Sequence, residues 1–173
     1  THTATWDWDD GDTSPGIVQE TGGSGTVTGD HTYTVPGVFT LNLAVEDNEG
    51  GVGESSFQYI VIYNPEGGFV TGGGWISSPA GAYPADPSLT GKANFGLNSK
   101  YHDGAAIPTG QTQFKFKAGD CSFHSEAYEW LVVFGARAWY KGTGRVNGES
   151  GYYFLVTAID GDIDPNDDIE EDR

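Results

Sequence analysis

Short segments of this chain alternate between apolar and polar residues. In the clearest one, residues 39–46, Phe39, Leu41, Leu43 and Val45 share one face, and mostly polar side chains occupy the other. A period of two is typical of a strand with one buried face. On this pattern, or on short apolar runs, we expect strands at 39–46, 56–63, 112–117, 130–140 and 152–159.

Turn-forming residues separate these segments. The sequence holds 27 Gly and 8 Pro, and both residue types mark turns and breaks. Gly135 interrupts the segment 130–140, where we expect a bulge or bend. Gly142-Thr143-Gly144 is expected to form a hairpin turn. Since no segment shows the period of 3.6 residues of an amphipathic helix, the sequence predicts an all-β fold.

A Pro- and Gly-containing segment, Asn64-Pro65-Glu66-Gly67-Gly68, directly follows a predicted strand. Such a segment is typical of a linker. We therefore expect two β-sandwich domains in tandem, the first over residues 1–64 and the second over 69–173, with the linker at 65–68. The second domain ends in an acidic tail.

Charge and composition exclude several classes of protein. The 173 residues include 25 Asp and Glu but only 8 Lys and Arg, which gives a net charge of −17. A charge this negative repels nucleic acid. Apolar runs are too short for a membrane helix, so no membrane insertion is expected. The single Cys121 excludes an internal disulfide and a cysteine-rich zinc site. The lack of Met predicts an excerpt from a longer protein.

The first domain carries a recognisable set of motifs. They are Trp6-Asp7-Trp8-Asp9-Asp10-Gly11-Asp12, His31-Thr32-Tyr33, Gly37-Val38-Phe39-Thr40-Leu41 and Val45-Glu46-Asp47-Asn48-Glu49-Gly50. In order and spacing, residues 3–63 resemble the PKD domain. This resemblance implies an immunoglobulin-like sandwich in which Tyr33 packs and bonds at a corner. Such a sandwich has seven strands over about 100 residues, so we expect the first two strands to be missing, either cut away or supplied by another chain.

The second domain is similar to a different family. Its motifs are Phe69-Val70-Thr71-Gly72-Gly73-Gly74-Trp75-Ile76, Gly91-Lys92-Ala93-Asn94-Phe95-Gly96, Phe114-Lys115-Phe116-Lys117, Phe123-His124-Ser125 and Tyr140-Lys141-Gly142-Thr143-Gly144. These resemble the post-COAP domain, which implies a place in a secreted bacterial multidomain protein and no assigned enzymatic activity. The resemblance also implies a last strand beyond the acidic stretch, which the sequence lacks.

Two acidic segments are candidates for calcium sites, since calcium takes hard oxygen ligands. In the first domain, Asp7, Asp9, Asp10 and Asp12 are expected to converge with Asp47 and Glu49 at one end of the sandwich. The alternative is that these carboxylates only cap turns in water. In the tail, Asp160, Asp162, Asp164, Asp168 and Glu171 follow the spacing of an EF-hand loop. Pro165 stands where that loop needs Gly, so a solvated acidic loop is the alternative.

Aromatic residues of the second domain are the remaining candidates for ligand binding. Exposed rings can stack on sugars, and the residues proposed for this role are Trp75, Tyr101, Trp139 and Tyr152. Core packing is the alternative for each. The sequence supports no enzyme, because Cys121 and His124 would point to opposite faces of a strand. Glu126 and Glu129 could form the carboxylate pair of a glycosidase, but any acidic protein supplies such pairs by chance.

These features together predict a non-catalytic structural or adhesive segment of a secreted or cell-surface protein. We expect it to be stabilised by calcium and assembled into oligomers or filaments by strand complementation. Its partners would be other protein domains or copies of itself. The alternative is an accessory module that holds a secreted hydrolase on a polysaccharide.

Overall fold

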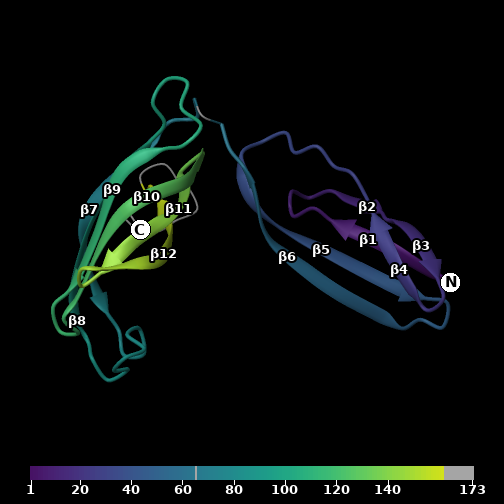
Figure 1. Ribbon diagram of the computed structural model, residues 1–173, viewed down its shortest axis with the longest axis horizontal. Coiled ribbons are helices and arrows are strands. Elements are labelled where there is room, and N and C mark those ends of the chain that lie inside the picture. The colour runs from purple at the N-terminus through teal and green to yellow at the C-terminus, as the bar shows by residue number, and fades with distance from the viewer. Residues whose placement is uncertain (65, 162–173) are drawn as a thin grey trace. The chain divides into compact units, whose positions relative to one another are not determined.

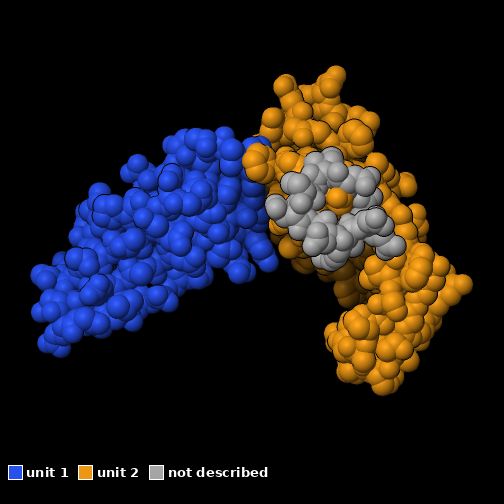
Figure 2. All heavy atoms as spheres, turned by 180° about the vertical axis from the view of Figure 1, so that it is seen from behind, with its two compact units in different colours: residues 1–62 blue, residues 63–173 orange. Residues whose placement is uncertain are grey.

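The computed structural model describes residues 1–64 and 66–161. The chain divides into two compact units, residues 1–62 (unit 1) and 63–173 (unit 2), which Figure 2 colours separately. The described residues form twelve strands and no helix, and therefore none that is long and apolar enough to span a membrane. The all-β prediction is confirmed.

Unit 1 contains a four-stranded antiparallel sheet and a separate hairpin (Figure 1). The sheet has the order β2-β1-β5-β6 and consists of β1 (His2–Asp7), β2 (Thr13–Pro15), β5 (Gly37–Asp47) and β6 (Val52–Ile62). The hairpin consists of β3 (Ile17–Thr21) and β4 (Ser24–Thr28). Strand β6 ends the sheet order, and most of its side chains are exposed.

The core of unit 1 lies between the sheet and the hairpin. Trp6 of β1 packs beside Gly29, where an added Cβ would lie 2.6 Å from the indole ring. Gly16 meets Val27 of β4 and Ala4 of β1 in the same way. Because glycine has no side chain, the two layers approach closely at these positions. Unit 1 is thus a two-layered β structure whose second layer is a single hairpin.

Unit 2 is one six-stranded antiparallel sheet in which each strand pairs with the next (Figure 1). Its strands are β7 (Phe69–Ser78), β8 (Gly91–Lys100), β9 (Thr109–Phe116), β10 (Cys121–Phe134), β11 (Arg137–Val146) and β12 (Glu149–Ile159). The buried cluster contains Leu131 and Tyr140, and both Val70 of β7 and Val156 of β12 pack against it. Since these two strands end the sheet order, the sheet must curve until its two halves face each other.

Most strand predictions are confirmed, including 39–46 within β5, 152–159 within β12 and, to within one residue, 56–63 and 112–117. Two glycine predictions are wrong. Gly135 has φ +57° and lies in the turn between β10 and β11, so the segment 130–140 is two strands of a hairpin. Gly142 and Gly144 lie inside β11 instead of forming a turn. There an added Cβ would come within 2.1 Å and 2.5 Å of the carbonyl oxygens of Ala127 and His124.

Candidate functional site

The acidic turn of unit 1 is held by its own carboxylates. After β1 the chain turns back with Asp9 at φ +63° and Gly11 at φ +97°. The carboxylate of Asp7 accepts a hydrogen bond from the N–H of Asp9 at 3.0 Å, and that of Asp10 accepts one from the N–H of Asp12 at 3.2 Å. Oδ2 of Asp9 accepts a bond of 2.7 Å from the N–H of Thr40 in β5. These acids therefore cap the turn and tie it to the neighbouring strand.

His31 joins this turn to the aromatic core of unit 1. Its Nε2 lies 2.7 Å from Oδ2 of Asp10, and its ring stacks on Trp8 with centroids 4.9 Å apart. The hydrogen bond from His31 is the main cause that lowers the pKa of Asp10. The rings of Tyr33 and His31 meet edge to face with centroids 4.7 Å apart. The Tyr33 hydroxyl donates a hydrogen bond of 3.0 Å to the carbonyl oxygen of Trp8. This bond confirms the packing and bonding expected of Tyr33.

Among the described residues, one group of three could hold a metal ion. Ligand atoms of Asp10, Asp12 and His31 all lie within 4.8 Å of one another. They would offer two carboxylates and one imidazole, whereas calcium takes six to eight oxygen ligands. Both oxygens of Asp10 already have partners in His31 and the N–H of Asp12. The group is therefore no complete calcium cage, and calcium binding stays a prediction.

The expected convergence of the two acidic turns of unit 1 is wrong. Strands β1 and β5 are antiparallel, and their register pairs His2 with Asp47 and Asp7 with Asn42. Asp9 contacts Thr40, and Asp47 lies seven residues further along β5, which is roughly 23 Å in an extended strand. Asp47 caps its own turn by accepting hydrogen bonds from Gly51 and Glu49, and these bonds lower its pKa.

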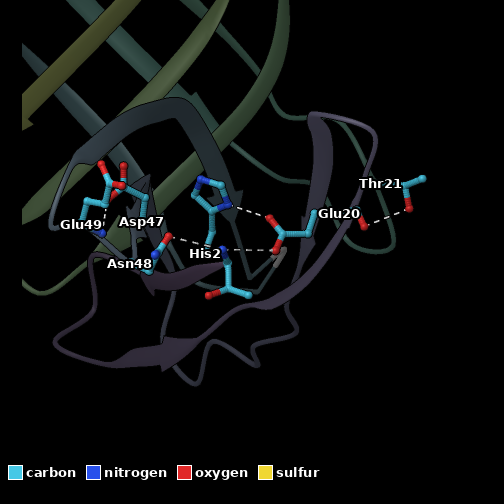
Figure 3. Close-up of polar contacts among 7 residues, drawn as sticks. His2, Glu20, Thr21, Asp47, Asn48 and Glu49 are labelled. Carbon is cyan, nitrogen blue, oxygen red and sulfur yellow. Dashed lines mark hydrogen bonds and ion pairs between the residues drawn. The ribbon is translucent and has the colours of Figure 1, made fainter.

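Figure 3 shows the end of unit 1 at which Asp47 lies. Nδ1 of His2 lies 2.6 Å from Oε2 of Glu20, and this hydrogen bond is the main cause that lowers the pKa of Glu20. The amino group of Thr1 lies 3.5 Å from Oδ1 of Asn48. These contacts link β1, the β3–β4 hairpin and the β5–β6 turn. Sequence reasoning missed His2 and Glu20, because no motif connects residues 18 positions apart.

The C-terminal acidic segment lies mostly outside the described residues. Asp162, Asp164, Asp168 and Glu171 belong to that part, so the EF-hand spacing stays a prediction. Asp160 directly follows β12, and its N–H donates a 2.8 Å hydrogen bond to the carbonyl of Ala136. This bond holds the end of β12 against the β10–β11 turn.

The four aromatic candidates do not form one platform. Trp75 is 61% exposed on β7, whereas Trp139 is half-buried on β11, four strands away in the sheet order. Tyr101 packs against the core, and its hydroxyl bonds both the carbonyl and the N–H of Leu131. Tyr152 lies opposite Gly144, on the same face of β12 as Phe154. Trp75 is thus the most exposed of the four rings.

Nucleophile and acid–base candidates are engaged in structural contacts. Burial raises the pKa of the Cys121 thiol, which favours its less reactive protonated form. Glu129 forms an ion pair of 2.8 Å with Lys141, and Glu126 accepts a hydrogen bond of 2.8 Å from Ser150. These interactions tie Glu129 of β10 to β11 and Glu126 of β10 to β12.

A long apolar groove, which the sequence did not predict, occupies the concave side of unit 2. It has a volume of about 1450 Å³. Residues of both end strands line it, from β7 on one side and from β12 on the other, and Phe95, Phe114 and Phe123 are among the residues between them. On β7, Gly72 and Gly74 present no side chains over Leu97 and Phe95. Among the described residues, β7 and β12 pair with no further strand.

The fold and these sites define an all-β chain of two sheet units, one with a capped acidic turn and one with an apolar groove. Comparisons of the chain with protein-family models, with curated proteins and with solved structures find no match. The PKD and post-COAP resemblances therefore stay predictions.

Proposed function

We propose that this chain is a non-catalytic structural or adhesive segment of a secreted or cell-surface protein, and that its open sheet is completed by an extended segment of another domain or of a second copy. The observation that carries this proposal is the groove of unit 2. An exposed sheet edge presents unpaired N–H and C=O groups. Here two such edges flank one apolar groove, so a strand placed in it would gain main-chain hydrogen bonds and bury alternate side chains.

Unit 1 supports the same proposal through its strand order. The order β2-β1-β5-β6 matches the C′, C, F and G strands of an immunoglobulin-type sandwich, and the hairpin β3–β4 matches D and E. The described residues of unit 1 hold no counterpart of strands A and B. Phe57 of β6 is correspondingly 63% exposed. Oligomers or filaments would form if the completing strands come from other copies.

Calcium stabilisation is a further part of the proposal. Unit 1 carries ten Asp and Glu but no Lys or Arg. Its acidic groups thus repel one another without a balancing Lys or Arg in the same unit, which destabilises a compact state. A divalent cation near the acidic turns would relieve that repulsion.

The test of the groove is hydrogen exchange of the chain in its monomeric form. We expect the amides on the free edges of β7 and β12 to exchange at least about 100-fold faster than those of β9. The reason is that no strand of the described residues pairs with these two edges. Equal protection would mean that the sheet is closed, which contradicts the proposal. In oligomers, Gly74→Lys should block assembly by placing a charge in the groove, whereas Gly73→Lys on the opposite face of β7 should leave assembly intact.

A second candidate function, that of an accessory polysaccharide-binding module, is favoured by the exposed indole of Trp75. Retention of the chain on insoluble glycans would support this function. The structural proposal requires no such retention.

A further inference from the structure

Lysine residues concentrate on one part of the sheet of unit 2. Lys92 and Lys100 lie in β8, Lys115 lies in β9, and Lys117 directly follows β9. All four are exposed, and they are half of the eight Lys and Arg residues of the chain. The segments 69–78, 91–100 and 109–117 contain no Asp or Glu. In a chain with a net charge of −17, this is a marked local reversal of charge.

The strand register places these residues on one face together with an exposed aromatic ring. Trp75 lies opposite Asn94, and Asn94 lies opposite Lys115. In the next row, Gly73, Gly96 and Gln113 are paired in the same way. Paired residues project to the same side of a sheet, and alternate residues such as Ala93 and Phe116 are buried on the other side. The side chains of this face thus point away from Phe95 and Phe114, which project from the other side of the same strands into the groove.

Trp75 and its neighbours form an open surface. Nζ of Lys92 lies 4.6 Å from the centroid of the Trp75 ring, a cation–π contact that places the ammonium group over one face of the indole. An added Cβ at Gly96 would meet nothing within 4 Å. A ligand can therefore reach the ring edge, the backbone and the side chain of Gln113 across this strip.

We propose that this surface binds an anionic polysaccharide that carries carboxylate groups. We name it the lysine face and define it by Trp75, Lys92, Asn94, Lys100, Gln113 and Lys115. An exposed indole stacks on the apolar face of a sugar ring, amide side chains bond hydroxyl groups, and ammonium groups pair with carboxylates. The inference rests on the second candidate function, polysaccharide binding, and specifies its ligand class and site.

The charge distribution supports an anionic ligand in spite of the net charge. All Lys and Arg residues lie in unit 2, whose described residues carry seven of them against eight Asp and Glu. At physiological ionic strength, charges further apart than about 8 Å are largely screened. A polymer on the lysine face would therefore interact mainly with its three lysines, Lys92, Lys100 and Lys115. Asp103, three residues after Lys100, is the acidic residue nearest to the lysine face along the chain.

The experiment measures binding of the whole chain to polygalacturonate, to its methyl-esterified form and to cellulose. We expect binding to polygalacturonate that is at least about tenfold tighter than to the ester, and that weakens as NaCl rises. Trp75→Ala and the double variant Lys92→Gln/Lys115→Gln should each weaken it about tenfold or more. Lys141→Gln is the matched control, since it removes one positive charge on β11, outside the lysine face.

The outcomes separate this inference from the function on which it rests. Equal binding to the charged and esterified polymers would keep a polysaccharide-binding module but overturn the anionic ligand. Binding to none of the three polymers would contradict both. Equal losses for Lys141→Gln and the lysine-face variants would overturn the site in favour of a general charge effect. If the lysine-face variants abolish only self-association at low salt, the face binds the acidic unit 1 of a second copy instead, and the proposal is wrong.

Discussion

The hydroxyl oxygen of Tyr140 lies 3.1 Å from Oγ1 of Thr112, and both residues are buried beneath the groove of unit 2. The same threonine oxygen lies 2.9 Å from the hydroxyl of Tyr128, and Oγ of Ser125 accepts the N–H of Thr112 at 2.8 Å. These groups connect β9, β10 and β11 through one buried polar network. Such networks stabilise a fold only when their members are bonded.

Tyr140→Phe should show the effect of this network on stability. Removing the hydroxyl deletes a buried hydrogen bond, so we expect a loss of about 1 kcal/mol in the free energy of unfolding at pH 8. Burial raises the pKa of Tyr140 to about 12. The contribution of the Tyr140 hydroxyl to the free energy of unfolding is therefore fully present below the ordinary tyrosine pKa of about 10. It is lost as the pH rises toward the folded-state pKa. Urea unfolding at pH 8 and pH 11 should show a smaller difference between wild type and variant at the higher pH.

The control for that comparison is Tyr153→Phe, because the side chain of Tyr153 is 72% exposed. We expect it to change the unfolding free energy little at either pH. A wild-type advantage over Tyr140→Phe that is as large at pH 11 as at pH 8 would contradict the assignment of the raised pKa to the buried hydroxyl.

The contact between His31 and Asp10 should make unit 1 sensitive to acid. Because the pKa of Asp10 is lowered, its carboxylate stabilises unit 1 at pH values above the ordinary aspartate pKa of 3.8. This stabilisation is lost as the pH falls through the folded-state pKa. His31→Phe keeps an aromatic ring beside Trp8 but removes the hydrogen bond. We expect its melting temperature at pH 7 to fall by roughly 2–5 °C, and its stability to decline less than that of wild type between pH 5 and pH 3.

A double-mutant cycle with Asp10→Asn tests whether the two side chains act through each other. If they do, the combined loss in the double variant will be smaller than the sum of the two single losses. Strictly additive losses would show that His31 acts only through its ring contacts.

Much of the fold was predictable because a strand with one buried face shows alternating apolar and polar residues in the sequence. Phe39, Leu41, Leu43 and Val45 alternate along β5, and this local pattern needs no knowledge of the rest of the chain. The corner bond of Tyr33 followed from a resemblance and is confirmed by its contact with Trp8. The candidate sites were harder to predict, because Asp9 and Asp47 are placed by the antiparallel register of β1 and β5. The groove depends on the curvature of a whole sheet, which no single segment encodes.

Gly142 shows why a glycine can be misread from sequence alone. The residues around it, Gly142-Thr143-Gly144, are of the kind found in turns, yet Gly142 lies inside β11. A Cβ added there would lie only 2.1 Å from the carbonyl oxygen of Ala127. Gly142→Ala forces backbone to move at a buried position, so we expect a loss of about 3 kcal/mol in the free energy of unfolding. Gly96→Ala is the matched control in the same sheet, since its Cβ meets nothing within 4 Å. Similar losses for both variants would contradict this reading of Gly142.

The effect of calcium on unit 1 is open to a direct measurement. A ligand that binds only the folded state raises the apparent melting temperature. We expect calcium to raise that of unit 1 above its value in excess chelator, because this unit has ten Asp and Glu and no Lys or Arg. NaCl at the same ionic strength is the necessary control, since salt also screens repulsion among exposed charges.

Two variants with the same change in charge distinguish a localised site from general screening. Asp12→Asn alters the group formed with Asp10 and His31, whereas Glu54→Gln removes a carboxylate from β6. A localised site predicts that Asp12→Asn loses most of the calcium-dependent shift and that Glu54→Gln keeps it. Equal reductions would assign the effect to the net charge of the unit. A wild-type shift no larger than that produced by NaCl would leave the acidic residues as caps of their turns, which the hydrogen bonds of Asp7, Asp10 and Asp47 already account for.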